Sequence, residues 1–133
     1  MLINAALWEQ APYAGRPCRV TVRLSYRSSN PDALIPPSEE APVLERFEAN
    51  LLGRFRFLHE ARLIARLTFS NARHFIFYGP DLAIKDARIT LTEVIKAYPR
   101  YHPDIEIESD PGWSRYVDLI NQGIPFDRLV MND

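Results

Sequence analysis

The stretch that decides the fold reads Arg19-Val20-Thr21-Val22-Arg23-Leu24-Ser25-Tyr26-Arg27. Apolar and polar residues alternate along it without a break, which is the pattern of a strand with one face on a core and the other in water. Three of the five polar positions are arginine, so this is the most concentrated chemistry in the sequence. We therefore predict a central β-strand whose Tyr26 points toward the core and whose arginines point away from it.

Composition and charge narrow the class of protein. The 133 residues are 47% hydrophobic and 25% charged, which predicts one globular domain with a core of its own. A net charge of −1 gives no reason to expect nucleic acid or an anionic membrane as an obligatory partner. The single Cys18 excludes an internal disulfide, and the three histidines have no metal-ligand spacing. The chain shows neither a signal peptide nor a membrane-length apolar segment, so we expect a cytoplasmic protein.

Further segments with clear periodicity follow the first strand. Leu44, Phe47, Leu51 and Phe55 recur at helical spacing, and we predict a helix from about Glu39 to Leu52 that stops at Gly53. The other expected elements are a strand at 61–69, a turn at Ser70-Asn71-Ala72, a strand at 73–78, a helix at 81–98, a strand at 102–108, and a short helix after Asp110-Pro111.

The order strand, helix, strand, strand, helix, strand is that of the split βαβ, or ferredoxin-like, fold. It places both helices on one face of a four-stranded antiparallel sheet with the strands in the spatial order 4-1-3-2. We predict a single α+β domain with an N-terminal arm at 1–17, a ferredoxin-like core at 18–109, and a C-terminal helix and tail at 110–133. Residues around Leu2 to Trp8 have the character of an extra strand, which must extend an edge of this sheet or pack elsewhere.

Four short motifs follow one another between Pro37 and Leu119. They are the acidic, leucine-studded helix 38–52, the hairpin 68–73, the strand end Phe77-Tyr78, and the closing Asp110, Trp113 and Tyr116. Together they resemble the bacterial family named domain of unknown function 695. Asn71 stands where that family usually has glycine, a change that a left-handed turn allows. The Leu-x-Pro that usually follows the tyrosine is also changed, because Leu119 is followed by Ile120-Asn121-Gln122-Gly123 before Pro125.

The resemblance implies an α+β domain related in shape to regulator of ribonuclease activity B, a protein inhibitor of an RNA-degrading enzyme. It transfers no activity, since the family has none assigned.

Residues that alternate away from the core are expected on the sheet face that the two helices leave uncovered. There Glu106 and Glu108 border the central arginines, and such cross-strand charge pairs contribute roughly 0.2–1 kcal/mol each. One interpretation is a solvated, charge-laddered face that keeps the protein soluble. The other is a partner-binding surface, because bulky groups lie among the charges as they do at interfaces. The candidate residues for that surface are Arg19, Arg23, Arg27, Arg62, Arg66, Tyr78, Glu106 and Glu108.

The aromatic third strand has two possible orientations. With an odd number of loop residues before it, Phe75 and Phe77 point inward, and His74, Ile76 and Tyr78 point outward. With an even number, the two sets exchange sides. In both cases apolar or aromatic groups lie among the charges of the face.

RNA binding is one alternative, because RNA-recognition motifs use this fold and stack bases on aromatic residues of their first and third strands. The stretch 73–78 is aromatic but lacks the glycine pattern of those motifs, and the first strand offers arginine, threonine and serine outward. Nucleic acid is therefore not the favoured partner.

A small enzyme with a carboxylate or histidine site is the other alternative. Glu106 and Glu108 are two residues apart on one strand, a spacing that suits an acid/base pair. Beside arginines, however, they are expected to be ion-paired, with pKa values too low for proton transfer near neutrality. Cys18 is expected to be a structural thiol, and Trp113 and Tyr116 to seal the core.

The sequence therefore predicts a non-catalytic domain that binds another protein through its uncovered sheet face, as a small regulator or inhibitor. No catalytic residue, cofactor, metal or membrane is expected.

Overall fold

One sheet organises the part of the chain that the computed structural model describes, which is residues 2–3, 15–26, 38–69, 71–81, 86–98, 101–121 and 127–128. Its strands lie in the order β5-β2-β4-β3-β1-β6. In chain order the elements are β1 (Leu2–Ile3), β2 (Cys18–Ser25), α1 (Ala41–His59), β3 (Arg62–Phe69), β4 (Ala72–Gly79), α3 (Ala87–Ile95), β5 (His102–Ser109), α4 (Ser114–Asn121) and β6 (Asp127–Arg128).

The predicted α+β class and the β-α-β-β-α-β order are confirmed. The four long strands are all antiparallel to their neighbours, and β2 lies between β5 and β4. This is the predicted 4-1-3-2 arrangement, with β2 as the first strand of that numbering. The start of the chain extends an edge, because β1 pairs with β3 and β6 pairs with β1 in parallel.

Helix α1 is longer than its pattern predicted. It continues through Gly53 to His59, and Glu60 ends it in the left-handed conformation at φ 51°. The expected stop at Gly53 was wrong because Phe55 carries the buried apolar stripe one turn further and is fully buried. Helix α3 begins later than the predicted start at residue 81, and residues 82–85 of that prediction lie outside the described part of the chain.

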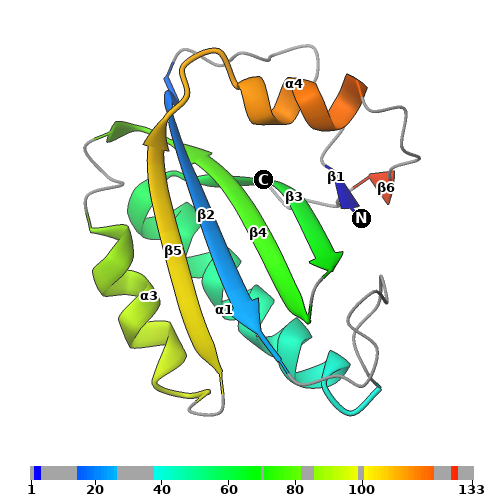
Figure 1. Cartoon of the computed structure of the whole chain (residues 1–133). Helices are drawn as coiled ribbons and strands as arrows, with labels where there is room; N and C mark the ends of the chain where they lie inside the picture. Colours follow the sequence, from blue (N-terminus) through cyan, green and yellow to red (C-terminus); the bar gives the residue numbers. More distant parts are fainter. Residues whose placement is uncertain are drawn as a thin grey trace.

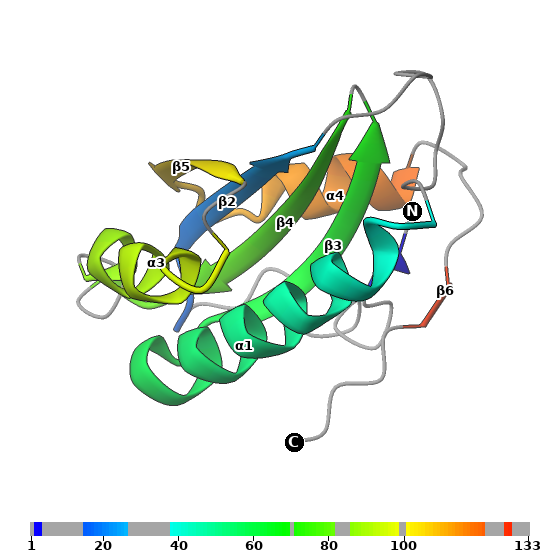
Figure 2. The same cartoon turned by 90° about the horizontal axis from the view of Figure 1, so that it is seen from below.

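Helices cover the sheet on both faces (Figures 1 and 2). Helices α1 and α3 lie together on one face, over the main core. Helix α4 lies on the opposite face, at one end of the strands, over a second and smaller core. The buried side chains of that second core are Ile64, Ala65, Leu67, Ile76, Tyr78, Trp113, Tyr116 and Leu119.

A β-bulge at Ile64 moves strand β3 from one core to the other. Leu63 pairs with Phe77, and Ala65 pairs with Ile76, so Ile64 is the extra residue. Before the bulge Leu63 belongs to the main core, and after it Ala65 belongs to the second core. The sequence pattern of the strand predicted at 61–69 places Leu63, Ala65 and Leu67 on one face. This prediction is wrong, because a one-residue insertion exchanges the two faces of every residue that follows.

The hairpin between β3 and β4 shows the consequence. Phe69 pairs with Ala72, so two residues join the strands, and Asn71 takes the expected left-handed conformation at φ 56°. With this two-residue loop and an unbroken β3, the side chains of His74, Ile76 and Tyr78 would point into the main core. The bulge has already exchanged the faces of β3, so Phe75 and Phe77 lie in the main core.

Candidate functional site

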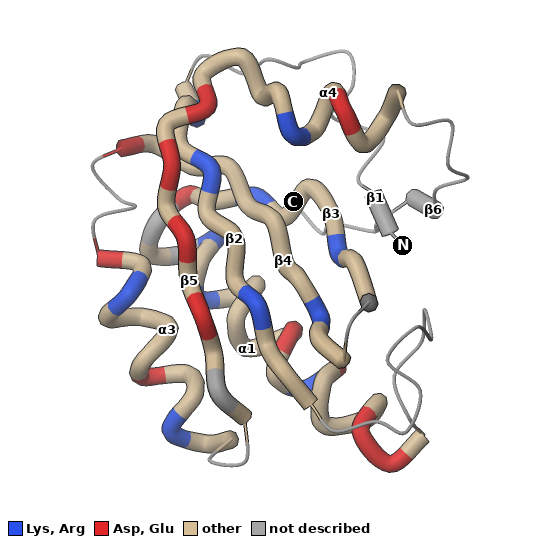
Figure 3. The backbone as a smooth tube through the Cα atoms, viewed as in Figure 1, with Lys and Arg blue, Asp and Glu red and all other residues tan. Residues whose placement is uncertain are grey.

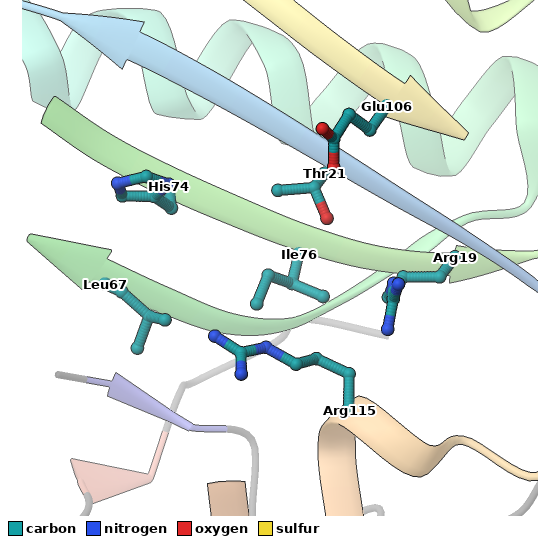
Figure 4. Close-up of a pocket in the computed structure, with 7 residues that line it drawn as sticks. All are labelled: Arg19, Thr21, Leu67, His74, Ile76, Glu106 and Arg115. Atoms are coloured by element: carbon teal, nitrogen blue, oxygen red, sulfur yellow. The ribbon is translucent and has the colours of Figure 1, made fainter. Parts of the chain in front are cut away.

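Helix α4 covers only one end of its sheet face and leaves a groove beside it. Two adjoining hollows, of about 320 and 390 Å³, make up this groove and share Thr21, His74 and Glu106. The hollow next to α4 is also lined by Arg19, Leu67, Ile76 and Arg115 (Figure 4). The hollow further from α4 is also lined by Arg23, Asp104 and Ile105. We call these ten residues the α4 groove.

Strand β2 forms the floor of this groove, because its alternation sends every second residue to the α4 side. Cys18, Val20 and Val22 are buried in the main core, whereas Arg19 and Arg23 lie on the groove side, as predicted. The predicted candidate Arg27 lies outside the described residues.

Strand β5 supplies the acidic wall of the groove (Figure 3). Arg19 Nη2 forms an ion pair with Glu108 Oε2, as the cross-strand register predicted. Arg23 Nη1 lies 3.9 Å from Asp104 Oδ2, with both side chains well exposed, so that pair contributes little. Glu106 lies opposite Thr21 instead of an arginine. The predicted pairing of Glu106 with a central arginine is therefore wrong.

Two groups in the groove keep their charge unpaired among the described residues. The Glu106 carboxylate has no ion pair there, and neither does the Arg115 guanidinium. Arg115 is half-buried, and its side chain extends from α4 toward Leu67 and Ile76 (Figure 4). An unpaired guanidinium held against apolar side chains in a hollow is suited to an incoming anion.

Arg66 is not part of this face, although the sequence placed it there. The bulge turns Arg66 to the side of α1, where its Nη1 donates to Glu48 Oε2 at 2.9 Å and to Oε1 at 3.2 Å. Both side chains of this pair are largely buried. Arg62 precedes the bulge and lies opposite Tyr78 in the register of β3 and β4, but it does not line the groove.

Tyr78 lies on the predicted face but is fully buried beneath α4. Its ring stacks on Trp113, with ring centroids 4.4 Å apart and planes at 17°. Tyr116 completes the cluster edge-on to Trp113 at 5.7 Å. Tyr78 therefore cannot touch a partner, and its assignment to the binding surface is corrected. The expectation that Trp113 and Tyr116 seal a core is confirmed.

Asp110 fastens α4 to the sheet. Its Oδ2 accepts the Tyr78 hydroxyl at 2.6 Å and lies 3.4 Å from Arg19 Nη1. Its Oδ1 accepts the backbone N–H of Ser114 at 2.9 Å and the Ser114 hydroxyl at 2.8 Å, so Asp110 also caps the helix. Because Asp110 holds the start of α4, it also fixes the position of Arg115 over the groove.

These contacts set the ionisation of the cluster. Burial by itself would raise the pKa of Asp110, but the hydrogen bonds from Tyr78, Ser114 and the Arg115 backbone outweigh it and lower that pKa. Burial, together with the bond to Asp110, raises the pKa of Tyr78 well above its ordinary value. Near neutrality the pair is therefore a carboxylate and a neutral phenol.

The main core holds the aromatic residues that an RNA-binding face would need. Phe75 and Phe77 of β4 point toward α1, where Phe55 lies 4.7 Å from Phe77 between ring centroids. Tyr78, on the other face, is covered. On the described part of the α4 groove, no phenylalanine, tyrosine or tryptophan is among the lining residues, and His74 is the one aromatic ring there.

Cys18 is a buried structural thiol, as expected. It donates to Asp81 Oδ1 at 2.5 Å, and burial with this contact raises the pKa of Cys18 to about 11. Across the described residues, no three His, Cys, Asp or Glu side chains gather as metal ligands would. In the same residues, no helix is both long and apolar enough to cross a bilayer.

The sequence identified the charged strands of the site but missed several of its residues. Asp104, Thr21 and His74 line the groove and follow from the alternation of their strands. Arg115 carried no signal of its own, because only the docking of α4 on this face brings its side chain over β4.

Comparison with known proteins supports the resemblance that the motifs indicated. The family described as "Family of unknown function (DUF695)" matches residues 1–120, which extends the resemblance to the N-terminal arm. Neither a curated protein nor a solved structure matches the chain. Since the match spans most of the chain, this protein belongs to the family of unknown function DUF695.

Proposed function

We propose that this domain is a non-catalytic protein-binding module, acting in the cytoplasm as a small regulator, and that the α4 groove is its binding surface. The observation that supports this best is the lining of the groove. Side chains from β2, β3, β4, β5 and α4 meet there, and most of them are polar or charged. Glu106 and Arg115 offer opposite charges that no described residue neutralises.

A protein partner fits this surface better than RNA does. Single-stranded RNA is bound mainly by stacking on aromatic rings and by basic grooves that follow the phosphates. Here the groove is lined by Asp104 and Glu106, which repel phosphate, and the phenylalanine and tyrosine side chains of β4 face the cores. Mixed charge beside apolar Ile76 and Leu67 is typical of protein interfaces.

A small enzyme is the second candidate, because His74 and Glu106 line both hollows of the groove. A histidine and a carboxylate in one hollow are a minimal acid/base set. If this candidate holds, time-dependent consumption of a metabolite from a cell extract will be seen with the wild type and lost in Glu106→Gln. If the extract is unchanged by both proteins, the binding function is favoured.

The test of the proposed function compares three immobilised proteins in a lysate. Thr21→Tyr fills the groove with a side chain that strands accept readily. Arg88→Glu changes a charge on the exposed side of α3, away from the groove, and is the matched control. We expect the wild type and Arg88→Glu to retain the same proteins from the lysate, and Thr21→Tyr to lose them.

Equal thermal midpoints of the three proteins show that the fold is kept. If Thr21→Tyr retains the same proteins as the wild type, the groove is not the binding surface, and the proposal fails.

A further inference from the structure

The α4 groove has a direction and a closed end. Its two hollows follow β2 from Arg23 to Arg19, which is four residue-to-residue steps or roughly 13 Å of strand. The hollow lined by Arg23 is the one further from α4. At the Arg19 end α4 lies across the strands, fastened there by Asp110 and Trp113 (Figures 1 and 4). A polypeptide lying along this floor has room for about four extended residues before it reaches α4.

The closed end carries positive charge. Arg115 extends into the hollow from the first turn of α4, with its guanidinium toward Leu67, and Arg19 lines the same hollow (Figure 4). Arg19 already binds Glu108 and Asp110, whereas Arg115 has no ionic partner among the described residues. A planar guanidinium binds a carboxylate through two parallel hydrogen bonds, and the apolar Ile76 and Leu67 strengthen such a contact by limiting water.

The side wall carries negative charge. Asp104 and Glu106 of β5 are both exposed and line the same floor, and Glu106 is unpaired among the described residues. Glu106 lies opposite Thr21, two residues from the closed end along β2. A cationic side chain within the last three residues of a bound segment would therefore meet this wall.

From these observations we propose that the α4 groove binds the C-terminus of a partner polypeptide. The free terminal carboxylate lies at Arg115, and a lysine or arginine just upstream faces Glu106 and Asp104. We favour a chain terminus over an internal loop as the occupant. Helix α4 lies across the groove at Arg115, and a chain that continued past this point would have to leave the sheet. This inference rests on the proposed function and specifies the partner.

The test uses fluorescein-labelled peptide pools in anisotropy titrations with the full chain. The first pool is fluorescein-Gly-Xaa-Lys-Xaa-Xaa with a free C-terminus, where Xaa is a mixture of small and apolar residues. A second pool has a C-terminal amide, and a third has Glu in place of Lys. We expect the free-acid lysine pool to bind roughly tenfold more tightly than each of the other two, since both contacts are charge-assisted.

Each variant should remove one preference alone. Arg115→Leu is expected to abolish the difference between acid and amide, and Arg115→Lys to restore part of it, because the charge returns without the planar fork. Glu106→Gln is expected to abolish the preference for lysine over glutamate while the carboxylate preference remains. Arg88→Leu, on α3, should leave both preferences unchanged. The Arg115 side chain makes no ion pair or hydrogen bond with the described residues, so we expect these variants to keep the fold, which circular dichroism checks.

Equal affinity of the acid and amide pools, a carboxylate preference that survives Arg115→Leu, or no binding of any pool overturns the inference. The proposed function is judged separately. If Thr21→Tyr still abolishes capture of proteins while the pools show no carboxylate preference, the groove binds a different kind of segment. If capture is also insensitive to Thr21→Tyr, both proposals fail.

Discussion

Replacing Tyr78 by phenylalanine removes a single oxygen from the contact that fastens α4 to the sheet. The ring remains stacked on Trp113, and Asp110 keeps its bonds to Ser114, so no carboxylate is left unpaired. The variant deletes the bond from the hydroxyl to Asp110 and also the backbone hydrogen bond that Tyr116 donates to the same hydroxyl. A hydrogen bond to a charged group contributes roughly 1.5–3 kcal/mol. The donor here is fully buried, and we expect the free energy of unfolding to fall by about 2 kcal/mol at pH 7. For a domain of this size that lowers the thermal midpoint by about 8 °C.

The pH dependence identifies the bond. The pKa of Asp110 is lower in the folded protein than in the unfolded chain. Its stabilisation is therefore complete above the unfolded pKa of about 4 and is lost as the pH falls through the folded pKa. The penalty of Tyr78→Phe should accordingly be full at pH 7 and shrink as the pH falls below about 4 toward the lowered pKa of Asp110, because protonation of Asp110 weakens the acceptor.

Urea unfolding followed by tryptophan fluorescence, at pH 7 and at pH 3, measures both effects. Tyr98→Phe is the matched control, because the Tyr98 hydroxyl accepts an exposed hydrogen bond from Asn50 at 2.9 Å and should contribute less than about 0.5 kcal/mol. A Tyr78→Phe penalty equal to that of the control refutes the reasoning. A penalty that is the same at both pH values also refutes it.

Three further predictions concern other parts of the molecule. Gly53→Ala should raise the free energy of unfolding by roughly 0.5–1 kcal/mol in urea titrations, since a Cβ there meets nothing within 4 Å and the residue is inside α1; a loss of stability would contradict it. Arg66→Met should lower that free energy by about 1–3 kcal/mol, because Glu48 loses its partner, and Glu48→Gln in the same chain should recover part of the loss. Cys18, with its pKa raised to about 11 by burial and Asp81, should react with a disulfide reagent at pH 8 roughly a hundredfold more slowly than an ordinary thiol; a rate equal to that of free cysteine would count against the buried geometry.

Periodicity was enough to predict the four long strands, their order and the inward side of β2. Those predictions rest on alternation over many residues, where Val20, Val22 and Leu24 each add to the same signal. The extent of α1 was less predictable. A glycine in an exposed helical position costs too little to end a helix whose next turn buries Phe55.

The bulge at Ile64 could not be predicted, and it changed the site most. The sequence from Arg62 to Phe69 is compatible with an unbroken strand, because the apolar Ile64 can lie on either face of the sheet. Only the presence of a second apolar layer under α4 makes the extra residue favourable. That layer depends on contacts between segments far apart in the sequence, which local patterning does not encode. Because the bulge turns Arg66 toward α1 and the second apolar layer holds α4 against the sheet, the candidate surface loses Arg66 and gains Arg115.

The position of α4 also limits how far the chain can be truncated from its C-terminal side. A fragment that ends after Ser109 would keep the four long strands and both helices of the main core, and would leave Ile64, Ile76 and Tyr78 facing water. Contiguous apolar surface of that kind promotes self-association. The smallest fragment that keeps this apolar surface covered should therefore extend through Leu119, although this helix follows the last strand of the predicted core in the sequence. The segment that makes the fragment soluble is also the one that closes the groove, so solubility and ligand capture should be lost together on truncation.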